Sequence, residues 1–215
     1  MKTTKSVVVI GKGPSVLQNT KEFIDSFDEV AICNFPPIDG FEQYIGTRAT
    51  HHFLNIHDPN PYSKDILNNL GLKKMFNTHP QAEGESNLFS KCFPDNHVEY
   101  YKWYGEKEIP KFQEEHGFDP SCATIAFDYF VKKEEYYKIA LVGFDCFKVG
   151  ERGYYFPVEQ TQESHRYLYR ADGSTPFDEK GYRVQSNPHD SESTEKFVHD
   201  MVKLYNKELI WKTKT

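Results

Sequence analysis

The chain has 215 residues, enough for one domain with a substantial hydrophobic core. Hydrophobic residues make up 38% and charged residues 27% of it, which is typical of a globular protein and excludes a disordered chain. The net charge of −6, with acidic and basic residues intermixed, argues against nucleic acid as the main partner. No apolar stretch approaches the roughly 20 residues of a membrane span, and the N-terminal apolar run is too short for a signal peptide.

Short β-branched runs alternate with helical patterns along the chain. The runs expected to form strands are residues 6–10, 30–33, 50–56, 73–77, 98–101 and 138–143. Helical spacing is found near residues 16–27, at 121–132 and at 194–207. This alternation predicts an α/β fold over residues 1–215: a single Rossmann-like domain whose mostly parallel central sheet is flanked by helices.

Residues 148–188 differ from the rest of the chain in composition and periodicity. They are rich in Tyr, Arg, Gly, Asp and Gln and have no sustained period. A long segment of this kind inside a compact domain is usually functional or disordered, so we expect a lid-like loop that contacts the acceptor before the last helix.

The four cysteines are Cys33, Cys92, Cys122 and Cys146. They form no Cys-x-x-Cys pair, so structural zinc is not expected. Cys33 and Cys146 lie in apolar runs and are interpreted as reduced core residues, which favours a cytoplasmic protein.

A glycine-rich segment follows the first predicted strand directly. It consists of Gly11, Lys12, Gly13, Pro14 and Ser15. At the carboxyl end of a parallel strand, a helix N-terminus offers N–H groups to an anion, and glycines let the backbone approach it. Ser15 is placed to cap the helix. A tight turn without a ligand is the alternative.

Two common nucleotide-binding motifs do not fit this segment. Val16 replaces the third glycine of the dinucleotide fingerprint, and Asn34 stands where a ribose-binding acid is required. No Gly-Lys-Ser/Thr follows at the spacing of a Walker loop.

The next stretch has four features in a fixed order. An asparagine ends a strand, a Gly-Phe-Glu turn follows, and then come a Gly-x-Arg segment and a histidine pair: Asn34, Gly40–Glu42, Gly46–Arg48 and His51–His52. This order resembles the large sialyl motif of glycosyltransferase family 29. The resemblance covers about residues 6–57. A weaker similarity, to the bacterial sialyltransferases of family 42, rests on Gly-x-Gly-Pro-Ser, Cys33-Asn34 and Asn55.

Asn34 and Asn55 end neighbouring predicted strands. Their amides offer both a donor and an acceptor, which suits a cytosine ring or a ribose. Alternatively, both side chains satisfy turn backbones. His51 and His52 point to opposite faces of one strand, so at most one of them is expected to be functional.

A second segment resembles the small sialyl motif. Ser121, Cys122 and Ala123 open a helix, and Gly143, Phe144 and Asp145 end the next strand. Cys122 and Ala123 depart from the family's hydroxyl residue and glycine, but small residues there supply the same backbone N–H groups. Asp145 either binds ribose hydroxyls or caps a backbone turn.

Beyond residue 150 the resemblance implies the catalytic groups. His189 stands just before the last helix, where the family has its catalytic histidine, but Thr194 replaces the glutamate that normally follows five residues later. Tyr154, Tyr155 and His165 are candidates for binding the leaving group, whereas Phe147 replaces a second phosphate tyrosine.

The resemblance implies an inverting transfer of sialic acid from CMP-sialic acid to a glycan hydroxyl. His189 would act as general base, and no metal or other cofactor is expected, since the sequence has no Asp-x-Asp pair. The expected partners are the nucleotide-sugar donor and the glycan acceptor. Three alternatives remain: a non-catalytic CMP-binding relative, a Mg²⁺-dependent pyrophosphokinase-like enzyme, and a lectin-like glycan binder.

Overall fold

The structure is a computed structural model that describes residues 4–55, 62–78, 98–102, 104–146, 154–156, 179–180 and 191–212. Within these residues, seven parallel strands form one sheet in the order β5-β4-β3-β2-β1-β6-β7. The strands are β1 (Lys5–Ile10), β2 (Glu29–Cys33), β3 (His51–Leu54), β4 (Lys74–Asn77), β5 (Glu99–Tyr101), β6 (Tyr136–Val142) and β7 (Glu208–Lys212). The predicted α/β fold with a parallel sheet is confirmed.

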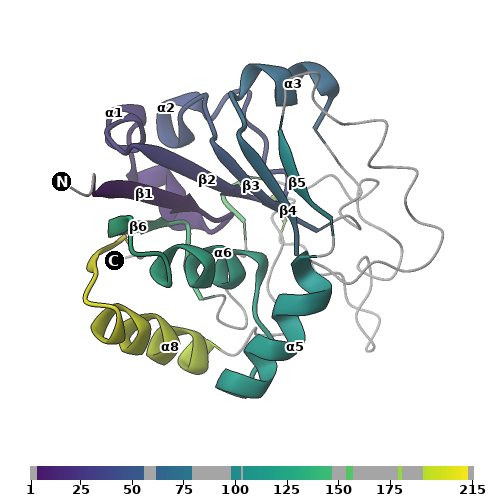
Figure 1. Ribbon diagram of the computed structural model, residues 1–215. Coiled ribbons are helices and arrows are strands. Elements are labelled where there is room, and N and C mark those ends of the chain that lie inside the picture. The colour runs from purple at the N-terminus through teal and green to yellow at the C-terminus, as the bar shows by residue number, and fades with distance from the viewer. Residues whose placement is uncertain are drawn as a thin grey trace.

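Helices cover both faces of the sheet (Figure 1). One face carries η1 (Pro14–Gln18), α1 (Lys21–Asp25), α2 (Glu42–Ile45) and α3 (Lys64–Asn69). The other carries α5 (Tyr104–His116), α6 (Cys122–Val131) and α8 (Ser191–Leu204). None of the helices in the described ranges is long and apolar enough to cross a membrane.

The core consists of two apolar layers, one on each side of the sheet. Val7 and Val9 of β1 pack into the layer beneath α6 and α8, whereas Val8 and Ile10 pack into the layer beneath α1 and α3. All four side chains are fully buried. A strand buried on both faces requires a continuous apolar run, which is why the sequence of β1 does not alternate.

The strand order reverses at β1. Strands β2 to β5 extend to one side of β1, and β6 and β7 lie on its other side. The connection after β1 therefore runs to one side of the sheet, towards β2, and the connection after β6 runs to the other side, towards β7. Where two such connections diverge, a crevice opens at the carboxyl ends of the strands, and ligands bind there in such sheets.

Several elements differ from the sequence prediction. The helical pattern near residues 16–27 is split into η1 and α1, because Asn19 is extended and its amide bonds back to the carbonyls of Ser15 and Val16. Thr20 then caps α1 by accepting a hydrogen bond from the Phe23 amide. Gly13, not Ser15, occupies the N-cap position of η1, so the expected Ser15 cap is wrong.

The predicted strands are present, but β7 and the helices α2, α3 and α5 were not anticipated. In β7, three consecutive apolar residues are flanked by Glu208 and Lys212, and this polar context obscures the strand pattern in the sequence. The strand lies at one edge of the sheet. The expected lid-like loop, residues 148–188, lies outside the described residues except for 154–156 and 179–180.

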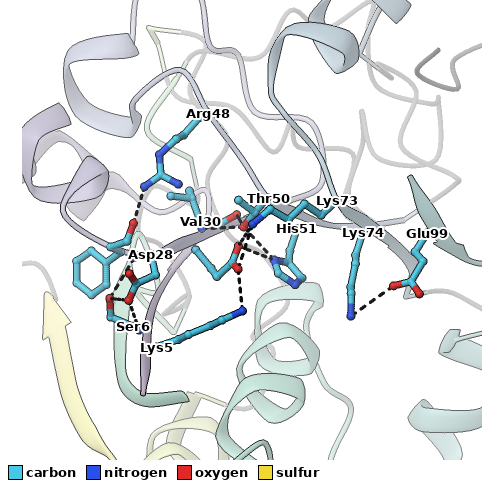
Figure 2. A network of polar contacts seen from close by, with 12 residues as sticks. Lys5, Ser6, Asp28, Val30, Arg48, Thr50, His51, Lys73, Lys74 and Glu99 are labelled. Atoms are coloured by element: carbon cyan, nitrogen blue, oxygen red, sulfur yellow. Dashed lines mark hydrogen bonds and ion pairs between the residues drawn. The ribbon is translucent and has the colours of Figure 1, made fainter. Parts of the chain in front are cut away.

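Figure 2 shows a charged network at the amino-terminal ends of the strands. The crevice lies at the other ends, the carboxyl ends, of the same strands. Buried Glu29 forms ion pairs of 3.3 Å with both Lys5 and Lys73, and His51 Nδ1 lies 4.0 Å from it. Burial alone would raise the pKa of Glu29, but Thr50, His51 and Lys73 lower it below its usual value. The network thus satisfies a buried carboxylate and has a structural role.

Candidate functional site

A pocket of about 110 Å³ opens at the carboxyl ends of β1, β2 and β6. Its lining comes from the loops after these strands, from the start of α6, from Tyr154 and from α8. The lining residues are Gly11, Lys12, Cys33, Asn34, Ser121, Cys122, Ala123, Gly143, Phe144, Asp145, Cys146, Tyr154 and Thr194. Segments that are far apart in the sequence therefore meet in one place, the switch point of the sheet.

The amides of the glycine-rich loop after β1 are used inside the protein. The Gly13 amide donates to the Gly143 carbonyl at 2.9 Å, and the Ser15 amide donates to Asp145 Oδ2 at 2.9 Å. Ser15 is fully buried, and neither it nor Gly13 or Pro14 is among the residues lining the pocket. Gly11 and Lys12 are the part of the loop that reaches the pocket.

The glycines of this crevice serve the close approach of two loops. A Cβ atom on Gly11 would collide with the carbonyl oxygen of Gly143, and one on Gly13 would collide with the Asp145 carboxylate. Gly143 itself has a φ of 66° and packs against the Val16 side chain. Ordinary side chains would force the β1 and β6 loops apart.

Asn34 follows β2 in a left-handed conformation with a φ of 58°, which asparagine tolerates better than most residues. Its Oδ1 accepts a hydrogen bond from the Asn55 amide at 2.9 Å. Asn34 lines the pocket, whereas Asn55 does not. The Asn34 oxygen therefore satisfies a turn backbone, as one interpretation of the sequence had it, and holds the loops after β2 and β3 together.

Neither histidine of the predicted pair lines the pocket. His52 is fully buried, and its Nε2 lies 2.6 Å from the Asn34 carbonyl oxygen, so this nitrogen carries the proton and donates. His51 belongs to the network at the amino-terminal edge. Burial lowers the pKa of each histidine to about 4, so both rings are neutral near pH 7.

The start of α6 presents helix-terminal amides to the pocket. Ser121 is the N-cap residue, and its Oγ accepts a hydrogen bond from the Thr124 amide at 3.1 Å. Cys122 and Ala123 follow as the first two residues of the helix, and both line the pocket. The first amides of a helix have no acceptor within it, so this end of α6 is suited to an anion or a carbonyl group.

Tyr154 and Tyr155 occupy different environments. Tyr154 lines the pocket, and the Lys12 ammonium lies 4.2 Å from the centroid of its ring. Tyr155 is 1% exposed, its hydroxyl donates to the Pro37 carbonyl at 2.9 Å, and its amide donates to the Lys12 carbonyl at 2.8 Å. Burial raises the pKa of Tyr155 far above its usual value. Tyr155 therefore anchors the segment that carries Tyr154.

The remaining predicted catalytic residues, His165 and His189, lie outside the described residues. Sequence reasoning did not select Cys33, Cys146 or Thr194 as site residues, although all three line the pocket. The signal for Thr194 was its position five residues after His189, where the family pattern has a glutamate. Its place on the first turn of α8 brings this position to the pocket.

Comparison of the sequence with models of protein families and with curated proteins found no match. Solved structures, in contrast, share the fold. The sialyltransferase CstII from Campylobacter jejuni, in complex with the substrate analogue CMP-3FNeuAc, superposes with a TM-score of 0.64 at 16% identity, over 97% of this chain and 82% of that one. A mammalian sialyltransferase superposes with a TM-score of 0.54 at 17% identity, over 98% and 70% of the two chains.

A third structure, of a CstII variant with one tyrosine replaced by phenylalanine, in complex with CMP, superposes with a TM-score of 0.61 at 16% identity, over 97% of this chain and 81% of that one. The class that these comparisons define is one of fold: this chain has the Rossmann-like fold of the sialyltransferases.

Proposed function

We propose that this protein is a sialyltransferase-like glycosyltransferase that binds CMP-sialic acid in the pocket and transfers the sugar to a glycan hydroxyl. One observation carries the proposal. The segments that resemble the large and small sialyl motifs are separated in the sequence, yet Lys12, Asn34, Cys122 and Asp145 line the same pocket. Structures with the same fold hold CMP or a CMP-sugar analogue.

The nucleotide would lie between the loops after β1, β2 and β6. Asn34 supplies a side-chain amide at the pocket, and the amides of Cys122 and Ala123 begin a helix beside it. These neutral groups suit a cytosine and ribose, which carry no charge. A pocket of about 110 Å³ is smaller than whole-ligand sites of roughly 300–1,000 Å³, so we assign to it only a part of the donor.

The departing phosphate requires donors and positive charge. Lys12 and Tyr154 lie together at the pocket and are the described residues suited to this role. Preorganised donors of this kind stabilise the charge that develops on a leaving group. Tyr155 is the weaker of the two tyrosine candidates, because its hydroxyl is already bonded to Pro37.

A base must remove the proton of the acceptor hydroxyl as the sugar is transferred with inversion. We assign this role to His189, because an ordinary histidine pKa of about 6.5 suits a base near neutral pH. What supports it is the position of α8: the helix begins at Ser191, and its first turn carries the pocket residue Thr194. In this mechanism Lys12, Tyr154 and His165 stabilise the departing phosphate by positive charge and hydrogen bonding, without a metal.

The direct test measures CMP-sialic acid turnover and CMP binding by calorimetry for the wild type and the His189→Ala variant. We expect binding to be retained and turnover to fall by about 10²-fold or more, as for loss of a general base. His199→Ala is a matched control, since His199 lies exposed on the helix that follows His189. Unchanged turnover in His189→Ala would contradict the assignment.

A non-catalytic CMP-binding protein is the second candidate. It is favoured by Thr194, which contributes a neutral side chain to the pocket where the family pattern has a glutamate. This candidate predicts CMP binding by the wild type with neither transfer nor hydrolysis of CMP-sialic acid. A calorimetric panel of CMP, CDP, UMP, ATP and sialic acid separates both candidates from other nucleotide enzymes and from a lectin.

A further inference from the structure

Several cysteine side chains line the pocket, and the proposed sugar transfer does not use them. Three of its lining residues are cysteines: Cys33 at the end of β2, Cys122 at the start of α6, and Cys146 in the loop after β6. All three are in the thiol form. A nucleophilic group at a ligand pocket is open to reagents small enough to enter the pocket.

Cys33 and Cys122 are neighbours across the sheet and helix layers. The Cys122 thiol donates to the Phe53 carbonyl at 3.0 Å, and Phe53 is the partner of Cys33 in the pairing of β2 with β3. Both side chains also belong to one apolar layer between the sheet and α6, in which Cys33 is buried and Cys122 packs against the buried cluster. The Cys146 thiol is directed to its own loop, where its sulfur lies 3.9 Å from the Phe144 carbonyl oxygen.

The two neighbouring thiols differ in reactivity. Burial alone would raise the pKa of the Cys122 thiol, whereas the neighbouring Cys33 thiol and the charge of Lys12 lower it. Burial raises the pKa of Cys33 well above its usual value, and Cys122 adds to this rise. Cys122 is also partly exposed and stands at a helix N-terminus, which favours a thiolate. Cys122 is therefore the more nucleophilic of the two.

We propose that Cys122 is an oxidation site, and that Cys33 is the resolving thiol that joins it in an intrachain disulfide across the floor of the pocket. The oxidant we assign is a small hydroperoxide, because a molecule of this size can enter the pocket. The consequence for donor binding rests on the function proposed above, whereas the sulfur chemistry does not.

The chemistry balances in two steps. The Cys122 thiolate attacks one oxygen of hydrogen peroxide, the O–O bond breaks, and a sulfenic acid and hydroxide form. The Cys33 thiol then attacks the Cys122 sulfur, the S–O bond breaks, and water leaves with the Cys33 proton. Overall, two thiols lose two electrons and two protons, and one peroxide becomes two waters.

The disulfide would alter the pocket where Asn34 meets the start of α6. Cys33 directly precedes Asn34, and Cys122 supplies one of the first two amides of the helix. A covalent bond between them draws the two sides of the floor together and changes the donor surface. We therefore expect oxidation to lower CMP affinity by about tenfold or more, with recovery after treatment with a thiol reductant.

The test begins with the full chain carrying Cys92→Ser, which removes the one cysteine outside the described residues. Hydrogen peroxide is added in near-stoichiometric amounts, and intact mass and peptide mapping follow. We expect a loss of two hydrogen atoms and a Cys33–Cys122 linkage. Adding Cys33→Ser should leave a sulfenic acid at Cys122 that a dimedone probe traps, whereas adding Cys146→Ser should leave the disulfide unchanged.

Three results would overturn the proposal. They are an unchanged intact mass at these peroxide levels, a disulfide that includes Cys146, and, in the Cys92→Ser chain that retains Cys33 and Cys122, dimedone labelling of Cys33 alone. CMP is added in a parallel arm and should slow the oxidation. If the disulfide forms but CMP neither binds nor protects, the proposed function fails while the thiol site stands. If CMP binds but no Cys33–Cys122 linkage forms, the thiol proposal fails alone.

Discussion

The Asp145 carboxylate accepts a hydrogen bond from the Ser15 amide at 2.9 Å, and thereby joins the loop after β6 to the loop after β1. Both loops contribute residues to the lining of the pocket at the switch point. Asp145 had two interpretations from the sequence, ribose binding or capping of a turn. Its bond to Ser15 is of the capping kind, and its position in the pocket lining leaves the ribose role as a proposal.

Replacing Asp145 with alanine should both destabilise the protein and weaken CMP binding. The Ser15 amide is buried, and losing its charged acceptor costs about 1–3 kcal/mol of unfolding free energy. Urea unfolding and calorimetry with CMP measure the two effects. Asp200→Ala on the exposed side of α8 is the control, with an expected change below about 0.5 kcal/mol. Equal stability of the two variants would contradict the structural role of Asp145.

The left-handed conformation of Asn34 predicts an order among its variants. Asn34→Gly loses the bond to the Asn55 amide but keeps the freedom to adopt a φ of 58°. Asn34→Ala loses both, so it should unfold about 1 kcal/mol more easily than Asn34→Gly. Asn34→Asp retains the acceptor for Asn55 and should be the most stable of the three.

CMP binding by Asn34→Asp separates the two roles of Asn34. If the amide nitrogen contacts the nucleotide, this variant should lose affinity while its urea midpoint remains near that of the wild type. Wild-type affinity in Asn34→Asp would restrict Asn34 to holding the loops.

The two neighbouring tyrosines should respond in opposite ways to loss of their hydroxyls. Tyr155→Phe leaves the Pro37 carbonyl without its donor and should cost about 1 kcal/mol of stability. Tyr154→Phe should change stability by less than about 0.5 kcal/mol and reduce the rate of sialic acid transfer instead. Thermal unfolding and turnover of both variants test this pair. Slower transfer by Tyr155→Phe alone would reverse the assignment.

Buried histidines predict that stability declines as the pH falls from about 6.5 to about 4. Burial lowers the pKa of His51 and His52 to about 4 in the folded protein, whereas an unfolded histidine titrates near 6.5. The unfolded state therefore takes up protons first, and each histidine contributes a slope of up to about 1.4 kcal/mol per pH unit within this window.

Urea unfolding across this window should show a clearly smaller slope for His51→Gln than for the wild type, whatever its absolute stability. The Glu29 carboxylate acts in the same direction at lower pH, because its pKa is lowered and its contribution is lost as it becomes protonated. A slope that is unchanged in His51→Gln would show that this ring titrates normally in the folded protein.

Local sequence predicted the strands well and the helices around the site unevenly. The runs that became β1, β2 and β6 are apolar and are followed by glycine or asparagine, and such local signals are sufficient for buried parallel strands. The split between η1 and α1 was missed because it depends on the Asn19 side chain, which replaces helical bonding with contacts of its own. Strand β7 depends on pairing with β6 at the sheet edge.

The sequence by itself determined the parallel α/β fold and which segments end at one edge of the sheet, because apolar runs and turn residues act locally. Only the tertiary structure decided how the residues of these segments are used. The Ser15 amide is occupied by Asp145, which lies 130 residues away in the chain. The packing of Cys33 with Cys122 in one apolar layer, and the burial of Tyr155 beside the pocket residue Tyr154, likewise depend on contacts between distant segments, which no local pattern specifies.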